Sequence, residues 1–208
     1  MRCRVNELLI VCAVAGAAAL AAPRIAAQEE LQDAATPTEI ITALHEAIVA
    51  QAAGSSEQSL EQRYEALRPI VERTHDLPYI AELSIRRYWD KLSAEQQQRF
   101  VAAFERLSVM TYVTRFADVT PETFAVQSSE DEDKGRVQVH AAITRADQDD
   151  ISLDYLLQER DGMWRIINIL ADQVSDLALK RAEYHRVLSN GTIDDLITEL
   201  ETQTSRLQ

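Results

Sequence analysis

The sequence predicts an α+β domain, in which N-terminal helices precede a four-stranded antiparallel meander and two C-terminal helices follow it. Three observations support this fold class. Apolar residues recur at helical spacing before Pro121 and then alternate with a period of two. The segments between the four strand-like stretches are short, which favours hairpins over crossover connections. Capping signals precede most of the helical stretches on both sides of the predicted sheet.

The first 27 residues have the pattern of a secretory signal peptide, which is removed from a mature protein. Arg2 and Arg4 give this segment a basic start, and an apolar run follows over residues 8–22. Small residues precede a suitable cleavage point after Ala27, and the apolar run is short for a membrane-spanning helix. The alternative is an uncleaved N-terminal anchor. We therefore expect residues 28–208 to form a single exported domain.

The cysteines and the charges restrict the possible chemistry. Cys3 and Cys12 both lie within the predicted signal peptide, so residues 28–208 contain no disulfide, thiol nucleophile or cysteine metal ligand. The whole chain carries a net charge of −13. Cleavage would remove three arginines and one glutamate, which leaves −15. Such a surface repels phosphate backbones, so binding to nucleic acid is disfavoured.

Three helices are predicted in the first part of the domain. Residues 36–39, with the sequence TPTE, form a capping box with proline at the first helical position, and this helix ends near Gly54. Residues 55–75 repeat apolar side chains at helical spacing and predict a second helix. Asp76 is the expected cap of a third helix that runs to about Leu92.

A fourth helix is predicted from Ser93, which forms a capping box with Gln96, to about Ala117. One apolar stripe contains Phe100, Phe104 and Leu107, and further apolar positions are Val101, Val109, Tyr112, Val113 and Phe116. This apolar surface is wider than one stripe that faces a sheet requires. Two interpretations remain open: a helix in the centre of the core, or a helix that packs on protein with one face and lines a cavity with another.

Four strands are predicted after Pro121, over residues 123–127, 136–144, 151–159 and 163–170. The second strand alternates most clearly, with apolar residues on one face and Gln138 and His140 on the other. The strands are linked by residues 128–135, 145–150 and 160–162. The last link contains Asp161 and Gly162, a pair that favours a tight hairpin because glycine tolerates a positive φ angle.

Two helices are predicted after the sheet. Ser175 is the expected cap of the first, which ends at Asn190 and Gly191, where a residue can adopt a left-handed conformation. Thr192 and Asp195 open the second, and its apolar face consists of Ile193, Leu196, Ile197 and Leu200. The sequence therefore predicts helices on one side of a curved sheet.

The sequence contains none of the common catalytic or metal-binding motifs described below. The four histidines are His45, His75, His140 and His185, and no two of them share one helical turn. We therefore expect no metal site and no cofactor. There is no glycine-rich phosphate loop and no G-x-S-x-G motif. The acidic segment 130–133 lacks the ligand spacing of a calcium loop, so we expect a solvated hairpin.

Asp154 and Tyr155 are the residues that an enzymatic role would use. Cone-shaped α+β enzymes place an acid and a tyrosine in an apolar pocket, where the acid acts as a base and the tyrosine stabilises an oxyanion. Neighbours in a strand point to opposite faces, so only one of the two can face a pocket. We expect Tyr155 to do so and Asp154 to be solvated.

A cationic group lies on the helix after the predicted sheet. Its members are Lys180, Arg181 and Arg186. Two interpretations remain open for them: contact with a lipid phosphate, or ion pairs with Glu183 and its neighbours.

Several spaced residues together resemble a known family. They are Trp89, Ser93, Glu95, Gln96, Phe100, Phe104, Thr111 and Tyr112, followed by Trp164, Val174, Ser175 and the segment 181–184, RAEY. In this order and spacing they are similar to the MlaC or toluene-tolerance family of periplasmic lipid-binding proteins associated with ABC transporters. The resemblance covers about residues 36–207. Residues 111–127, 151–166 and 174–184 look most like the hopanoid-biosynthesis-associated, HpnM-like branch. Three departures from the family pattern are Arg86, Asn168 and Gln173.

The resemblance implies a cone in which the sheet and the helices enclose lipid tails, while the headgroup stays near solvent. The protein would be a periplasmic carrier of a phospholipid or hopanoid-like lipid, with no catalytic residues. Its partners would be an inner-membrane ABC-type lipid transporter and an outer-membrane complex, contacted transiently. The expected lipid-binding residues are Trp89, Phe104, Tyr112, Phe116, Val139, Tyr155, Leu157, Ile167, Ile169 and Leu177. Which side of each strand faces the cavity is left open.

Two other functions compete with a lipid carrier. One is an enzyme of a cone-shaped α+β fold that acts on a small apolar substrate and uses Tyr155 or a nearby acid. The other is an interaction module whose cavity is filled by its own side chains. The missing catalytic motifs weigh against the first, and the two-faced helix weighs against the second.

Overall fold

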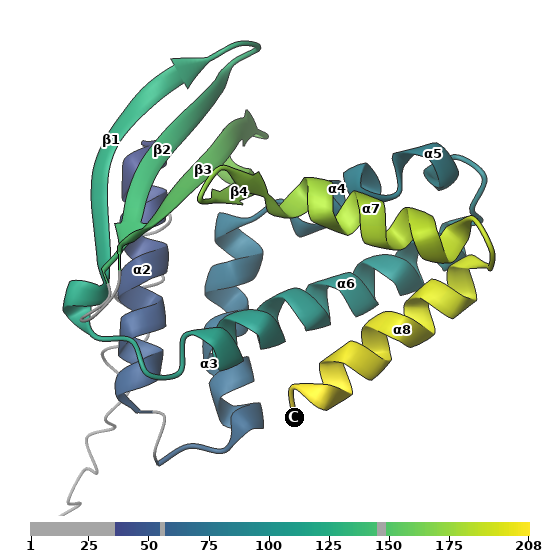
Figure 1. Cartoon of the computed structure of the whole chain (residues 1–208), viewed down its shortest axis with the longest axis horizontal. Helices are drawn as coiled ribbons and strands as arrows, with labels where there is room; N and C mark the ends of the chain where they lie inside the picture. Colours follow the sequence, from purple (N-terminus) through teal and green to yellow (C-terminus); the bar gives the residue numbers. More distant parts are fainter. Residues whose placement is uncertain (1–35, 55–56, 145–148) are drawn as a thin grey trace, which may run out of the picture.

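The computed structural model describes residues 36–54, 57–144 and 149–208. It confirms the predicted α+β class, with an antiparallel sheet flanked by helices (Figure 1). The predicted signal peptide, its alternative as an anchor, and both cysteines lie outside the described residues, as does most of the predicted link 145–150. Within the described ranges, no helix combines the length and the apolar character needed to cross a membrane.

The helices before the sheet are α2 (Pro37–Ala53), α3 (Leu60–Thr74), α4 (Leu77–Ser84), α5 (Arg86–Trp89) and α6 (Ala94–Arg115). The predicted capping boxes at Thr36 and Ser93 are present. A further capping box at Ser59 sets the start of α3, five residues later than the predicted helix begins. Side chains at these positions satisfy backbone N–H groups that would otherwise lack partners.

The predicted third helix is divided in two at Ile85. This residue leaves the helical conformation, with φ −123° and ψ 27°, and its side chain is 2 % exposed. The break carries Ile85 into the core, and burial of an aliphatic side chain contributes about 2 kcal/mol. Arg86 follows the break and forms an ion pair with Glu82 one turn earlier.

The sheet has five strands instead of four, and their spatial order follows the chain: β1 (Phe124–Glu132), β2 (Arg136–Ile143), β3 (Ile151–Arg160), β4 (Met163–Ala171) and β5 (Val174–Ser175). All neighbouring pairs are antiparallel, as predicted. The extra strand has two residues. A second difference is that β1 continues into the acidic segment, so most of the predicted solvated loop is an exposed strand paired with β2.

In two tight turns a glycine occupies a position with a positive φ angle, whereas a third turn has no glycine. Asp161 and Gly162 have φ angles of 53° and 76°, which confirms the predicted hairpin. Lys134 and Gly135 make a similar turn between β1 and β2. The β4–β5 turn instead has two positive φ angles without a glycine, and the second of them, 66°, belongs to Gln173.

A β-bulge changes the alternation of β4. Leu157 of β3 is the register partner of Ile166, whereas Leu156 is the partner of Asn168, so Ile167 is an extra residue without a partner. A bulge of this kind shifts every later side chain of the strand by one position relative to its neighbour. Residues on either side of the bulge therefore share a sheet face at an odd separation in sequence.

The two helices after the sheet are α7 (Asp176–Leu188) and α8 (Ile193–Arg206), with the predicted caps at Ser175 and Thr192. The prediction of a left-handed end to α7 is wrong, because Ser189 is helical and Gly191 has no positive φ. Gly191 is required for space instead. A Cβ atom there would lie 2.8 Å from a carboxylate oxygen of Asp195, which closes the capping box of α8.

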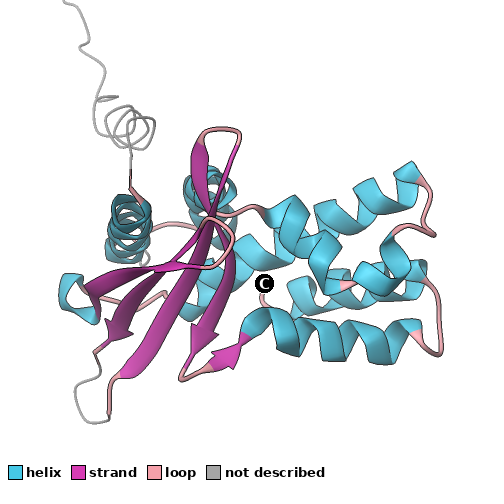
Figure 2. Cartoon of the chain, turned by 90° about the horizontal axis from the view of Figure 1, so that it is seen from above, coloured by secondary structure: helices cyan, strands magenta, loops and turns pink. Residues whose placement is uncertain are grey.

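The helices divide into two groups around the sheet. α2 packs against β1, β2 and β4, and α3 and α4 contact β4. α6 packs against α3, α4 and α8, and its buried residues toward the core are Phe100, Phe104, Val109, Met110 and Val113. Figures 1 and 2 show α6, α7 and α8 extending beyond one edge of the sheet. α6 thus connects the helices that pack on the sheet with α8.

Candidate ligand-binding cavity

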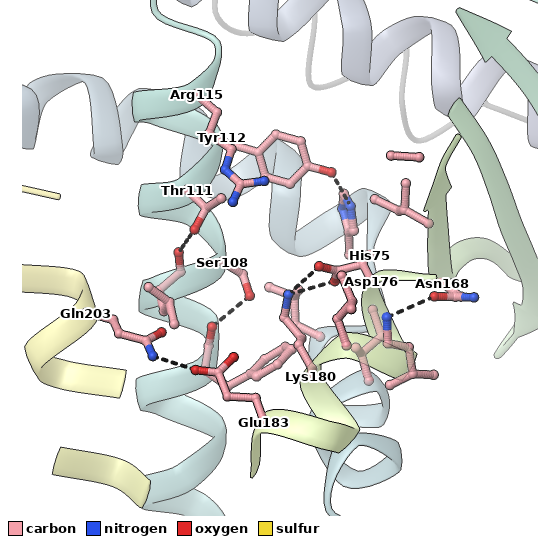
Figure 3. A pocket seen from close by; sticks show the side chains of 18 of the residues that line it. His75, Ser108, Thr111, Tyr112, Arg115, Asn168, Asp176, Lys180, Glu183 and Gln203 are labelled. Atoms are coloured by element: carbon pink, nitrogen blue, oxygen red, sulfur yellow. Dashed lines mark hydrogen bonds and ion pairs between the residues drawn. The ribbon is translucent and has the colours of Figure 1, made fainter. Parts of the chain in front are cut away.

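A cavity of about 670 Å³ lies where α6, α7 and α8 meet the edge of the sheet formed by β3, β4 and β5. α4 contributes a further part of the wall (Figure 3). The apolar part of the lining consists of Leu77, Ile80, Phe104, Leu107, Phe116, Leu153, Ile169, Ala171, Val174, Leu177, Leu179 and Leu207. A cavity of this size and composition suits an apolar ligand of several hundred daltons.

The lining contains one face of α6 in addition to its core face. Leu107, Thr111 and Tyr112 line the cavity and are half-buried, whereas Val109 and Val113 are fully buried on the opposite side. Thr111 directs its hydroxyl back to the carbonyl of Leu107, at 2.7 Å, so its methyl group is left for the wall. Of the two interpretations of this helix, the structure shows the second, in which one face packs on protein and another lines a cavity.

Six of the ten predicted lipid-binding residues line this cavity. They are Phe104, Tyr112, Phe116, Tyr155, Ile169 and Leu177. Tyr155 and Ile169 are register partners on adjacent strands, so they lie on the same face of the sheet. Contact of any of these side chains with a ligand stays a prediction.

The other four predicted residues lie elsewhere. Val139 and Leu157 share the sheet face of Tyr155, but both are fully buried in the core beside the cavity. Ile167 is the extra residue of the bulge, so it does not share the face of Ile169 as a strict alternation would require. Trp89 ends α5 and packs at the edge of the core, where its carbonyl accepts a hydrogen bond from Gln97.

Two buried histidines hold two of the three tyrosines that line the cavity. Nε2 of His75 lies 2.8 Å from the hydroxyl of Tyr112, and Nε2 of His45 lies 2.9 Å from that of Tyr155. Nδ1 of His75 lies 3.1 Å from the carbonyl of Val71, which can only accept, so Nδ1 carries the proton and Nε2 accepts from Tyr112. This arrangement uses the hydroxyl proton of Tyr112 in the hydrogen bond to His75.

Burial fixes the protonation state of these four side chains. Loss of hydration lowers the pKa of His45 and of His75 to about 4, so both are neutral at pH 7. Burial also raises the pKa of Tyr112 and of Tyr155 above the ordinary value for tyrosine. A protonated tyrosine that donates to a neutral histidine is a structural pair, and at pH 7 it is a weak general acid or base.

Asp154 points away from the cavity, as the alternation of strand neighbours requires, but the prediction that it is solvated is wrong. Its side chain is buried, and Oδ1 lies 2.7 Å from Nδ1 of His140 while Oδ2 accepts from Gln173 at 3.1 Å. The hydrogen bond with Asp154 is the main reason why the pKa of His140 is raised. His140 also lies 3.2 Å from Glu130, so a polar row crosses the outer face of the sheet.

The junction between the sheet and α7 depends on Asn168. Its side-chain oxygen accepts from the hydroxyl of Ser175 at 3.1 Å and from the backbone N–H of Leu177 at 3.2 Å. Asn168 therefore caps the start of α7 from the neighbouring strand and fixes Leu177 in the cavity wall (Figure 3). The asparagine that departs from the family pattern thus has a direct structural role.

The rim of the cavity carries charged side chains. Lys180 is paired with Asp176, with both carboxylate oxygens at 2.7 Å, and Glu183 accepts from Gln203 at 2.8 Å. Within the cationic group of α7, Lys180 therefore pairs with Asp176, and Arg181 donates to the carbonyl of Leu83. Two other cations of the lining, Arg115 and Arg206, were not among the predicted site residues, because they end different helices.

Within residues 36–54, 57–144 and 149–208, no group of three or more histidine, cysteine, aspartate or glutamate side chains could hold a metal ion. The fold and the site define an α+β protein with a largely apolar cavity that is partly open to solvent. The family model described as MlaC protein matches residues 41–202. The chain therefore belongs to the MlaC family.

A search of solved structures gives one further comparison. The fold is similar to that of a phospholipid-binding protein from Ralstonia solanacearum, whose structure was determined in complex with a phospholipid. The TM-score is 0.72 at 18 % sequence identity, and the match covers 82 % of this chain and 97 % of that protein. A search of curated proteins found no match.

Proposed function

We propose that the protein is a periplasmic carrier that shields the tails of a lipid in its cavity. The observation that carries this proposal is the largely apolar cavity of about 670 Å³ between α6, α7 and the sheet. Membership of the MlaC family and the phospholipid held by the Ralstonia solanacearum protein support it. We infer that the ligand is a phospholipid and that residues 28–208 form the mature domain.

The energetics explain why a carrier needs such a cavity. Each buried CH₂ group contributes roughly 0.8 kcal/mol, so a 16-carbon tail represents about 12 kcal/mol of transfer free energy. A carrier must match most of this with its own apolar surface, because otherwise the lipid stays in the membrane. Handover then depends on a difference in affinity between the carrier and its partner.

The proposed partners are the inner-membrane ABC-type lipid transporter and an outer-membrane complex of the same transport system. Family membership supports this assignment. A hopanoid-like ligand is the second candidate, and the resemblance of residues 111–127, 151–166 and 174–184 to the hopanoid-biosynthesis-associated branch favours it. No catalysis is part of the proposal. Tyr112 and Tyr155 are held by neutral histidines, and Asp154 faces the other side of the sheet.

Native mass spectrometry tests the carrier proposal directly. The protein is expressed from its full-length sequence and purified from the periplasm without detergent, and its lipid is extracted and identified. We expect one lipid per chain and a protein mass that fits cleavage after Ala27. A bare-chain mass, with no lipid in the extract and none taken up from liposomes, would contradict the proposal. The chemical class of the lipid decides between a phospholipid and a triterpenoid.

A variant that fills the cavity gives a second test. Ile169 lines the cavity and is half-buried, so Ile169→Trp should reduce the lipid bound per chain. Met163 is 46 % exposed at the start of the same strand and does not line the cavity, so Met163→Trp is the matched control. Equal lipid content in both folded variants would mean that the ligand binds elsewhere.

A further inference from the structure

Two arginines of the cavity lining have no charged partner among the described residues. Arg115 and Arg206 both line the cavity and form no ion pair or hydrogen bond with another described side chain. The other two arginines of α6 are paired: Arg99 lies 2.8 Å from Asp194, and Arg106 lies 3.6 Å from Glu61. Unpaired arginines are unexpected in a chain with a net charge of −13, in which carboxylates outnumber cations.

The charges of the lining do not cancel. The lining contains the cations Arg115, Lys180 and Arg206 and the carboxylates Asp176 and Glu183. Lys180 and Asp176 neutralise each other at 2.7 Å, and Glu183 accepts a hydrogen bond from the amide of Gln203. The cavity thus has an excess of positive charge, whereas the whole protein is acidic.

The two arginines lie at the same end of the molecule. α6 and α8 pack together and run in the same direction, and an ion pair between Arg99 and Asp194 aligns their N-terminal turns (Figure 1). At a rise of 1.5 Å per residue, Arg206 lies roughly 18 Å further along α8 and Arg115 roughly 24 Å further along α6. Figure 3 shows the side chain of Arg115 directed beside Tyr112.

We infer that Arg115 and Arg206 bind the phosphate of a phospholipid headgroup at one end of the cavity while the tails occupy its apolar part. This inference rests on the proposed carrier function. A guanidinium group presents several N–H donors in a planar fork that matches two phosphate oxygens, and such charge-assisted hydrogen bonds are about twice as strong as neutral ones. Both groups are exposed enough to exchange water for a ligand.

A different explanation for these arginines makes a different prediction. Both occupy the last turn of a helix, where a cation interacts favourably with the helix dipole. If that were their whole role, their removal would lower stability slightly and leave the choice of lipid unchanged. Lipid selectivity therefore separates the two explanations.

The test measures which lipid the protein takes from a membrane. The full-length expressed protein, stripped of lipid, is incubated with vesicles that contain equal amounts of phosphatidylglycerol and diacylglycerol with the same acyl chains, and native mass spectrometry gives the ratio bound. We expect the wild type to prefer phosphatidylglycerol. In the double variant Arg115→Gln/Arg206→Gln this preference should fall roughly tenfold. Arg87→Gln is the control, because Arg87 is exposed and does not line the cavity.

Each outcome has a defined meaning. Equal uptake of both lipids by the wild type, or an unchanged preference in the folded double variant, overturns the headgroup inference and leaves the carrier proposal intact. Uptake of neither lipid by the wild type contradicts the carrier proposal itself. Competition by millimolar inorganic phosphate without lipid uptake identifies a site for free phosphate and also overturns the inference.

A measurement on the wild type covers the case in which the double variant does not fold. Raising the salt concentration from about 0.05 to about 0.5 M shortens the screening length and weakens exposed charge interactions. We expect the preference for phosphatidylglycerol to fall over this range while diacylglycerol uptake stays constant. A preference that does not respond to salt contradicts a role for the two arginines.

Discussion

The stability of the cavity wall depends on two histidine–tyrosine pairs. His45 is 5 % exposed and His75 is 3 % exposed, and each forms a hydrogen bond with a tyrosine of the lining. Protonation of either histidine would place a positive charge in buried surroundings, where it loses its hydration. The wall of the cavity is therefore sensitive to acid at two defined positions.

The pH dependence of stability follows from these pKa values. Burial lowers the pKa of His45 and of His75 to about 4, whereas the unfolded chain titrates near 6.5. Between these values the unfolded state binds more protons, so the free energy of unfolding falls as the pH falls through this window. We expect a loss of about 3 kcal/mol per histidine between pH 7 and pH 4, measured by urea unfolding.

Variants that lack the ionisable group isolate this effect from the titration of carboxylates. His45→Gln and His75→Gln keep a side chain that can accept from the tyrosine, and each should show a shallower pH dependence than the wild type. His185 is exposed, so His185→Gln serves as the control for the loss of a histidine as such. Identical slopes in all four proteins would show that the buried histidines are not responsible.

Gln173 carries backbone strain at the turn between β4 and β5. Its φ angle of 66° lies in the left-handed region, which costs a residue with a Cβ atom about 1–2 kcal/mol. Its side chain donates to Asp154 at 3.1 Å, which partly offsets this cost. We expect the free energy of unfolding of Gln173→Gly to exceed that of Gln173→Ala by about 1 kcal/mol, measured by urea titration.

The same pair of substitutions within an extended strand provides a control of opposite sign. Gln138 lies in the middle of β2, where glycine loses more backbone entropy than alanine on folding. We expect Gln138→Gly to be less stable than Gln138→Ala by about 0.5–1 kcal/mol. If glycine were the less stable residue at both positions, position 173 would not be strained.

At the scale of elements, α6 supports both the core and the cavity. Phe100 is 0 % exposed and contacts Phe104 with ring centroids 6.3 Å apart, while Leu107 lines the cavity and is half-buried. We expect Phe100→Ala to lower the free energy of unfolding by about 3–5 kcal/mol, because it leaves a void in packed protein. Leu107→Ala should cost less than half as much, because its side chain already borders open space.

Chemical denaturation of the two variants, each with its lipid removed, tests this division of α6. Removal of the lipid matters because a bound ligand would stabilise both variants. Equal losses of stability would show that the cavity face of α6 is packed as tightly as its core face.

Helix starts could be predicted from the sequence, whereas the faces of the strands could be predicted only in part. Capping boxes at Thr36, Ser93 and Thr192 marked helix starts correctly, because capping depends on residues only three positions apart. The fold class was likewise accessible from the change in hydrophobic period. The break at Ile85 was not, because it depends on what the distant core can accommodate.

The cavity shows the same limit. Phe104, Tyr112 and Phe116 follow from helical spacing on α6, and each lines the cavity. Ile167 does not line the cavity, because a bulge that no local motif predicts shifts the alternation of β4. The burial of Asp154 also depends on a long-range partner, His140, on the neighbouring strand. Local periodicity therefore identified the apolar faces, and only pairing in space identified which residues meet.

At the scale of the whole molecule, a bound ligand should stabilise the folded protein, as buried side chains of the core do. A ligand that binds only the folded state raises stability by RT ln(1 + [L]/Kd), about 2.7 kcal/mol at a hundredfold excess over Kd. We expect removal of the lipid to lower the Tm by several degrees, measured by differential scanning calorimetry. Reloading from vesicles should restore the Tm, and an identical Tm in both forms would show that the cavity is stable without a ligand.

The strand order has a consequence for the kinetics of folding. Each strand pairs with its neighbour in sequence, and few residues separate the two, so little loop entropy is lost when the sheet forms. The cavity instead joins His75 of the α3–α4 junction to Leu207 at the end of α8, which are more than a hundred positions apart. We expect pulse-labelled hydrogen exchange to show protection in β2 and β3 before α8. A lipid present during refolding would then meet a formed sheet before it met an enclosed binding site.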